Sequence, residues 1–235
     1  MIDSKITVAI DGFSSTGKST VAKQLAKELS YVYVDTGAMY RAITLYAMRK
    51  KYITKDSFDV ESLIHDLPSL NLKFIFDESL GYAAIYLNDE NIEDEVRTLE
   101  VSQYVSRVAA LSKVREKLVA QQQEMGLEKG VVMDGRDIGT VVFPNAELKI
   151  FMTATAKERA ERRFKEMKEQ GQDVNYEEVL KNVMDRDHLD TTRKDSPLVK
   201  AEDAIEIDNS SLNIDEQFQK ILQLVKQTLA SEKDK

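Results

Sequence analysis

The chain has 235 residues, a length that predicts one or two domains with ample material for a core. Its net charge of −8 argues against nonspecific binding to nucleic acids or anionic membranes, because both depend on clustered positive charge. Cysteine is absent, which excludes disulfides and thiolate metal sites and fits a reducing cytoplasm.

A strand, a glycine-rich loop and a helix are predicted at the start of the chain. Ile6, Val8 and Ile10 suit a buried parallel strand over residues 5–11, and helical spacing follows over 18–29. Between them lies the loop Gly12-Phe13-Ser14-Ser15-Thr16-Gly17-Lys18-Ser19-Thr20. In such a loop the backbone surrounds an anion, the lysine reaches the β- and γ-phosphates, and the first serine after it faces Mg²⁺. A solvated turn is the alternative, but the flanking elements favour a nucleoside triphosphate site.

Strand and helix patterns alternate along most of the remaining chain. Further strands are expected at residues 31–34, 130–134, 147–153 and 203–207. Helices are expected at residues 37–51, 98–125, 156–170, 175–190 and 214–231, with capping side chains at Thr155 and Asn175. This alternation predicts an α/β fold in which helices cover both faces of a five-stranded parallel sheet.

Residues 70–97 interrupt the alternation. Two strand-like runs, 71–76 and 83–87, are separated by turn residues, which predicts an antiparallel hairpin inserted into the α/β domain. A short helix is expected just before it, at residues 60–67.

A second polar site follows the strand at 31–34. Thr36 is expected to cap the next helix, and Arg41 lies two residues from both Met39 and Ile43, roughly 200° around that helix. Because ligands of open α/β sheets bind beyond the carboxyl ends of strands, Arg41 is predicted to face the phosphate loop. A solvated surface arginine is the alternative.

The third site comes at the end of the strand at 130–134. An aspartate in this place holds a metal-bound water in phosphate-loop enzymes, so Asp134 is a candidate for Mg²⁺ through water. Arg136 and Asp137 follow between two glycines. They either act on a ligand or only pair with each other, and an exposed pair stabilises by less than about 1 kcal/mol.

The fourth site lies on a predicted helix. Arg186, Asp190 and Arg193 are spaced i, i+4 and i+7, so they share one face that suits sugar hydroxyls and phosphates. An ordinary helix ion pair is the alternative. The arginines of the preceding helix, Arg159, Arg162 and Arg163, are more ambiguous, because glutamates three or four residues away offer them solvated ion pairs.

Together these motifs resemble the bacterial cytidylate kinases of the nucleoside-monophosphate kinase group. The likeness runs from Ile6 to about Leu229 and includes the hairpin insert. The segments that carry it are 35–41, 96–98, 114–115, 134–144 and 186–193. It implies one phosphate-loop kinase domain over 1–235, in three layers. Its core would be 1–35, 98–155 and 195–235, its monophosphate-binding region 36–97 with the insert 70–97, and its helical lid 156–194.

The resemblance also implies roles for single residues. Ser106, Arg115 and Asp137 match the positions that contact the cytosine edge. The monophosphate would be held by Arg41, Arg136 and Arg193, and the sugar and neighbouring phosphates by Arg186 and Asp190, with Thr36 also on the substrate side. Arg159 and Arg163 fall in the lid over the triphosphate. Phe13 and Thr36 depart from the family, which commonly has proline and serine there.

The predicted activity is in-line transfer of the γ-phosphoryl group of MgATP to CMP or dCMP. Lys18, Arg136, Arg186 and Arg193 would neutralise the transferring group, and no strong general base is required because the acceptor oxygen is already anionic. The alternatives are a kinase for another acceptor such as UMP, and a GTPase switch, although no Asn-Lys-x-Asp segment is present. We expect a cytoplasmic protein, because the first five residues contain no leader pattern and no run approaches the roughly 20 apolar residues of a membrane span. The resemblance implies a monomer.

Overall fold

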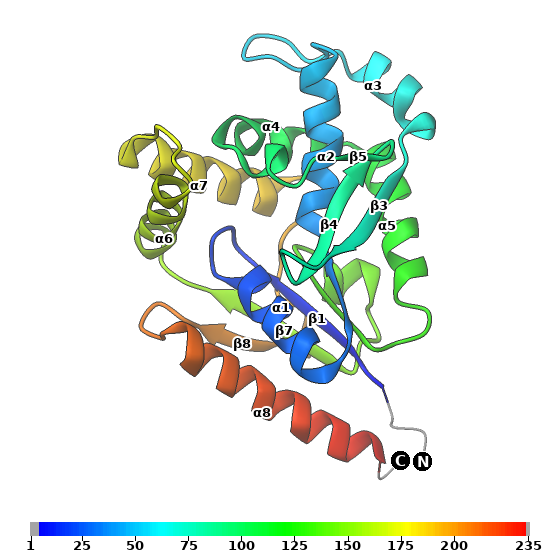
Figure 1. The fold of residues 1–235 in the computed structure, drawn as a ribbon, viewed down its shortest axis with the longest axis vertical. Helices are drawn as coiled ribbons and strands as arrows, with labels where there is room; N and C mark the ends of the chain where they lie inside the picture. The colour runs from blue at the N-terminus through cyan, green and yellow to red at the C-terminus, as the bar shows by residue number, and fades with distance from the viewer. Residues whose placement is uncertain (1–4, 234–235) are drawn as a thin grey trace.

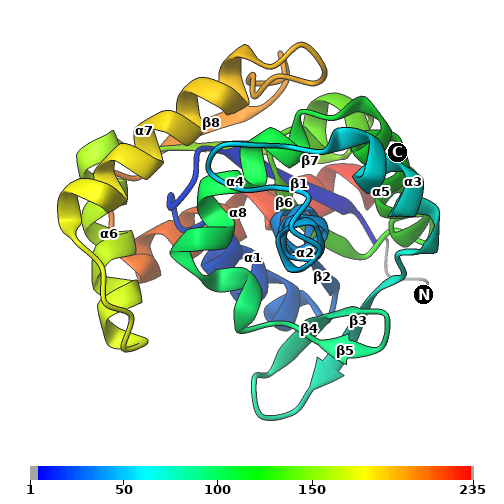
Figure 2. The same cartoon turned by 90° about the horizontal axis from the view of Figure 1, so that it is seen from above.

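A computed structural model describes residues 5–233, so most of the segment that bears on a leader, residues 1–4, lies outside the described part. Five parallel strands form the central sheet in the order β2-β6-β1-β7-β8 (Figures 1 and 2). Their bounds are β1 (Thr7–Gly12), β2 (Val32–Asp35), β6 (Val131–Gly135), β7 (Leu148–Thr153) and β8 (Ile205–Asp208). The predicted five-stranded parallel sheet is thereby confirmed.

Alternating side chains of the sheet enter two separate cores. Ile6, Val8 and Ile10 pack against α1 (Lys18–Leu29) and α8 (Ile214–Lys233) on one face. The other face, with Ala9 and Met133, packs against α2 (Thr36–Arg49), α4 (Leu99–Ala109) and α5 (Ser112–Met125). Successive side chains of a strand point to opposite faces, and all six residues of β1 are buried, so helices cover both faces of this strand. The result is the predicted three-layer arrangement.

The region expected to form one helix over 98–125 contains two. Ala110 and Leu111 separate α4 from α5, and Leu111 has extended backbone angles. The break lets α4 pack on α2 and α7 (Tyr176–Thr192) while α5 packs on the segment that follows β6. Neither glycine nor proline marks this position, so the helical pattern continues through it unchanged.

The insert is a three-stranded antiparallel sheet rather than a simple hairpin. β3 (Leu72–Asp77) pairs with β4 (Tyr82–Leu87), and β4 pairs in turn with the two-residue strand β5 (Glu90–Asn91). The short helix α3 (Val60–Asp66) precedes it, followed by a 3₁₀ turn, Leu67–Ser69. β5 was missed because a two-residue strand is too short to show alternation.

The α6–α7 pair lies on the side of α1 opposite to the insert (Figures 1 and 2). α6 (Ala156–Glu169) begins at the predicted cap Thr155, whose hydroxyl accepts a hydrogen bond from the amide of Glu158. Asn175 caps α7, accepting from the amide of Glu177. Within residues 5–233 the structure contains no helix of the length and hydropathy that crossing a membrane requires.

Gly12 marks the point where the chain leaves β1, and a side chain there would collide with β7. Its φ is +144°, and a Cβ atom would lie 2.0 Å from the backbone oxygen of Met152. Gly171, just after α6, also has a positive φ, +76°, but apart from Gly171 and its two chain neighbours no atom of residues 5–233 lies within 4 Å of its Cβ position. Comparing substitutions at the two glycines therefore distinguishes the cost of backbone strain from the cost of steric collision.

We expect Gly12→Ala to lower the free energy of unfolding by about 3 kcal/mol, combining left-handed strain with overpacking against a backbone atom. The control Gly171→Ala should lose only about 1 kcal/mol, from backbone strain alone. Urea unfolding of both variants measures the difference. Equal losses would contradict the close approach of β1 and β7.

Candidate functional site

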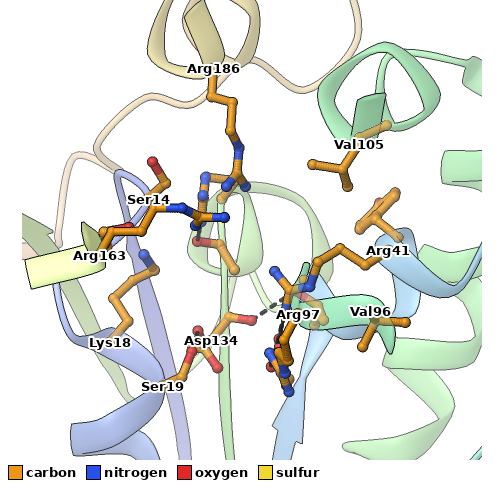
Figure 3. A pocket seen from close by; sticks show the side chains of 18 of the residues that line it. Ser14, Lys18, Ser19, Arg41, Val96, Arg97, Val105, Asp134, Arg163 and Arg186 are labelled. Carbon is orange, nitrogen blue, oxygen red and sulfur yellow. Dashed lines mark hydrogen bonds and ion pairs between the residues drawn. The ribbon is translucent and has the colours of Figure 1, made fainter. Parts of the chain in front are cut away.

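A cavity of about 340 Å³ lies where β2 and β6 end and α1 begins (Figure 3). It is bounded by α2, α4, α6, α7 and the segment after the insert. The predicted residues that line it are Ser14, Ser15, Gly17, Lys18, Ser19, Thr20, Thr36, Arg41, Ser106, Arg115, Asp134, Arg136, Asp137, Arg163, Arg186, Asp190 and Arg193. Gly12, Phe13, Thr16 and Arg159 do not line it.

The glycine-rich loop turns into α1 with Lys18 as the first helical residue. Gly17 takes a left-handed conformation at φ 84°, and the Lys18 ammonium donates to the backbone oxygen of Phe13 and, at 3.3 Å, to the Thr16 hydroxyl. Burial, with the nearby guanidinium of Arg136, places the pKa of Lys18 well below its usual value. A desolvated cation at a helix N-terminus is strongly attracted to a bound anion, because both the charge and the free amides favour it.

Asp134 lies at the end of β6 beside the first turn of α1. It accepts hydrogen bonds from the hydroxyls of Ser19 and Tyr33, each at 2.9 Å. Burial and the neighbouring carboxylate of Asp35 raise the pKa of Asp134. Among residues 5–233, no cluster of three or more histidine or acidic side chains forms a metal cage. A hydroxyl beside one carboxylate instead fits Mg²⁺, which keeps several waters and takes its other ligands from phosphate oxygens.

Asp35, rather than Thr36, caps α2, which corrects the expected cap. The Asp35 carboxylate accepts from the amide of Ala38 at 2.8 Å. Thr36 instead donates its hydroxyl to the backbone oxygen of Asp134 at 2.7 Å. A Cβ atom on Gly135 would lie 2.5 Å from that hydroxyl, so glycine is needed for β2 and β6 to be linked in this way.

A chain of alternating charges extends from Arg41 toward the insert. Asp35 pairs with Arg41 at 3.2 Å and with Arg97 at 2.7 Å, and Arg97 also pairs with Glu93 at 2.7 Å. Burial alone raises the pKa of Asp35, but the two arginines lower it well below its usual range. Arg41 thus faces the cavity as predicted, and is not a solvated surface arginine.

Arg136 and Asp137 have separate partners instead of pairing with each other. Asp137 forms a buried ion pair with Arg115 of α5. Arg136 pairs with Asp190 of α7 at 2.9 Å, and the Ser106 hydroxyl donates to the same carboxylate at 2.8 Å. The turn after β6 therefore connects to both α5 and α7.

The residues expected to share a face of α7 do meet at the cavity. Arg186 donates to the Ser102 hydroxyl at 2.9 Å, and burial lowers its pKa well below the usual value. Burial alone would raise the pKa of Asp190, but Arg136 and Arg186 lower it. α7 ends at Thr192, so Arg193 lies just past the helix, where it donates to the backbone oxygen of Ser196.

The three arginines of α6 have different surroundings. Arg159 is buried behind the phosphate loop, where it donates to the Ser14 backbone oxygen and pairs with Asp187. Its guanidinium lies 5.1 Å from the Phe13 ring centre. Arg162 bonds to Asn209. Arg163 faces the cavity, and burial and the charge of Arg41 lower its pKa to about 10.

Several cationic groups at the cavity retain unused hydrogen-bond donors. Within residues 5–233, no hydrogen-bond acceptor reaches the buried Nε atoms of Arg41, Arg115, Arg163 and Arg186 or Nη2 of Arg193. Figure 3 shows Arg41, Arg163 and Arg186 pointing toward the same space as Lys18. Unpaired buried donors are costly unless a ligand satisfies them, so the site is built for a polyanion.

Sequence reasoning assigned no role to Arg97, Glu93, Lys23 or Tyr82. All four line the cavity, and the Lys23 ammonium lies 3.1 Å from the Tyr82 ring centre. Tyr82 belongs to the insert, Glu93 and Arg97 follow the insert, and Lys23 is a partly buried residue of α1, and no helical or strand periodicity marks any of them as a binding residue. For Arg97 the available signal is the segment 96–98, one of those that carry the family resemblance.

Comparison with known proteins finds sequence relatives that share one family. The family model of cytidylate kinases matches residues 8–227. A cytidylate kinase of Flavobacterium johnsoniae is 66% identical over 221 residues, covering 94% of this chain and 96% of that protein. One of Flavobacterium psychrophilum is 65% identical over 94% of this chain and 98% of its own. A cytidylate kinase of Phocaeicola vulgatus is 55% identical over 91% and 93%.

We expect Arg163→Met to stabilise the ligand-free protein by about 1 kcal/mol, because it removes a desolvated cation that faces other cations. The same change should weaken binding of inorganic tripolyphosphate about tenfold, through the loss of a charge-assisted donor. Differential scanning fluorimetry and calorimetric titration measure the two effects. Lys165→Met, at an exposed position of α6, is the control and should change neither. A destabilised Arg163→Met variant would contradict the assigned electrostatics.

Proposed function

The chain belongs to the cytidylate kinase family, and we propose from this that it transfers the γ-phosphoryl group of ATP to CMP or dCMP, giving ADP and the diphosphate. One observation carries the proposal: a single cavity joins the phosphate loop to a wall containing the buried Arg115–Asp137 pair. The loop provides a site for the donor. The buried pair provides directional hydrogen bonding for an acceptor base.

The donor phosphates would lie against the loop amides and the Lys18 ammonium, with Arg163 above them. Ser19 and Asp134 would hold Mg²⁺, Asp134 through water, since their oxygen atoms already lie 2.9 Å apart. When bound, the metal neutralises charge on the donor phosphates. Arg159 supports this site from behind, because it fixes the Ser14 carbonyl and joins the loop to α7 through Asp187.

The acceptor would lie between α2, α4 and α7. Arg41, Arg136 and Arg193 surround the place of its phosphate, and the unpaired donors of Arg41 and Arg193 are available to it. Asp137, Arg115 and Ser106 would contact the cytosine edge, where a carboxylate and a hydroxyl accept from the exocyclic amine. Arg186 and Asp190, with Thr36 nearby, would contact the sugar side.

Catalysis then consists of alignment and charge neutralisation. The acceptor oxygen is anionic at neutral pH, so the chain needs no strong general base. Lys18, Arg136, Arg186 and Arg193 all line the cavity, where they would neutralise the charge that develops during transfer. The division of the chain into a core, a monophosphate-binding region and a lid is part of this proposal. The lid, residues 156–194, would exclude water from the site during transfer. A monomeric state and a cytoplasmic location stay predictions.

An acceptor panel tests the activity directly. With ATP as donor, CMP and dCMP should be phosphorylated with kcat/KM at least about tenfold above UMP, AMP and GMP, because uracil lacks the exocyclic amine that cytosine has beside a ring acceptor, and the purines are larger than a pyrimidine. Coupled ADP release measures each rate, and Lys18→Met supplies the background. ADP release without any acceptor dependence would support a nucleotide-regulated switch instead, and a preference for UMP would support the other kinase.

Asp137→Ala should reduce kcat/KM for CMP by about a hundredfold, because it leaves Arg115 buried without its partner and removes the acceptor for the base amine. The KM for ATP should stay within about twofold, since Asp137 is not part of the phosphate loop and its ion-pair partner is Arg115 of α5. Steady-state kinetics with both substrates varied separate the effects. CMP turnover within twofold of wild type would show that Asp137 does not contact the base.

A further inference from the structure

Asp11 is a buried carboxylate to which the proposed mechanism gives no role. It directly precedes Gly12, is 5% exposed, and does not line the cavity. Its two oxygens accept hydrogen bonds from consecutive backbone amides, Ile138 at 2.8 Å and Gly139 at 2.7 Å. The side chain thus connects the strand that carries the phosphate loop to the segment that follows Asp137.

The turn that presents Arg136 and Asp137 is held by Asp11 at both ends. On the near side, the backbone of Asp11 pairs with Gly135 in the register of β1 and β6. On the far side, its carboxylate holds the first turn of a π-helix, Ile138–Val142. The two residues between these contacts are the ones predicted to meet the acceptor nucleotide.

The π-helix makes this segment dependent on an external partner. The backbone oxygens of Asp137 and Ile138 accept from Val142 and Phe143, five residues ahead, and such helices are rare and frequent at functional sites. The amides of Ile138 and Gly139 begin the helix and have no helical acceptor before them. Asp11 supplies both acceptors.

This arrangement has an electrostatic cost. Burial raises the pKa of Asp11 to about 6, and the amides of Gly139 and Ile138 limit the rise. The charge of Asp137 contributes to this increase in the pKa, whereas that of Lys18 opposes it. A neutral side chain would avoid the cost of desolvation, but only a carboxylate presents two acceptor oxygens to two adjacent amides.

We propose that Asp11 is a positioning residue that aims Arg136 and Asp137 at the acceptor nucleotide while keeping their turn at a fixed offset from the phosphate loop. The proposal rests on the proposed function of those two residues. In this proposal a single side chain, that of Asp11, sets the spacing between the donor half and the acceptor half of the site.

The test is Asp11→Asn, which keeps the shape but turns an NH₂ group toward one of the two amides. We expect kcat/KM for CMP to fall by about tenfold or more, mainly through a higher KM for CMP, because a misplaced turn weakens ground-state and transition-state contacts. The ratio of kcat/KM for CMP to that for UMP should fall with it. The KM for ATP should stay within about twofold.

The matched control is Glu147→Gln, a second carboxylate that accepts from a β1 amide, Thr7 at 2.8 Å, at the amino-terminal end of the strand. It should lower the melting temperature without altering the CMP to UMP ratio. If Asp11→Asn also lowers only the melting temperature, its role is structural and the proposal is overturned. Equal increases in the KM for ATP and for CMP would also overturn it, by placing the effect on the phosphate loop.

A measurement on the wild-type protein covers the case in which Asp11→Asn does not fold. The amides of Ile138 and Gly139 should be protected from hydrogen exchange as strongly as those of β1, and fast exchange at either would overturn the proposal. Failure of the activity itself is distinguishable. If wild-type protein shows no preference for CMP over UMP, the proposed function fails whatever Asp11→Asn does.

Discussion

The repulsion among buried cations around one cavity is the constraint on which the rest of the structure depends. Lys18, Arg41, Arg136, Arg163 and Arg186 all face this space, and burial lowers the pKa of four of them. In a chain with a net charge of −8, the excess of acidic side chains lies elsewhere, so the local field opposes the overall one. Bound phosphates relieve this repulsion, so substrate binding also stabilises the folded protein.

Three carboxylates hold the cations in place without neutralising all of them. Asp35 pairs with Arg41 and Arg97, Asp137 with Arg115, and Asp190 with Arg136. Each carboxylate lies at or just after the end of a strand or on α7, so rigid elements fix its position. The guanidinium groups therefore keep their orientation but retain free donors, as a preorganised anion site requires.

Sequence patterns predicted the parallel sheet, most helices and many cavity residues, because each of these is marked by local periodicity or a loop motif. Ser106 and Arg115, which also line the cavity, were predicted only through the family resemblance. The patterns failed at three places where no local signal marks the observed outcome. The break at Ala110 and Leu111 lacks glycine and proline, and β5 is too short to alternate. Thr36 and Asp35 are both good capping residues, and the position of Asp134 across the sheet decides between them.

By itself, the sequence determined the fold class, the phosphate loop and the residue types of the site, since these depend on spacing along the chain. Only the tertiary structure decided which charged groups pair. Arg136 with Asp190 and Arg115 with Asp137 join residues 54 and 22 positions apart. It also separated Arg163, which faces the cavity, from Arg159, which supports the loop. The physical reason is that pairing depends on distance and burial in space, and both arise only when the strand ends and helices come together.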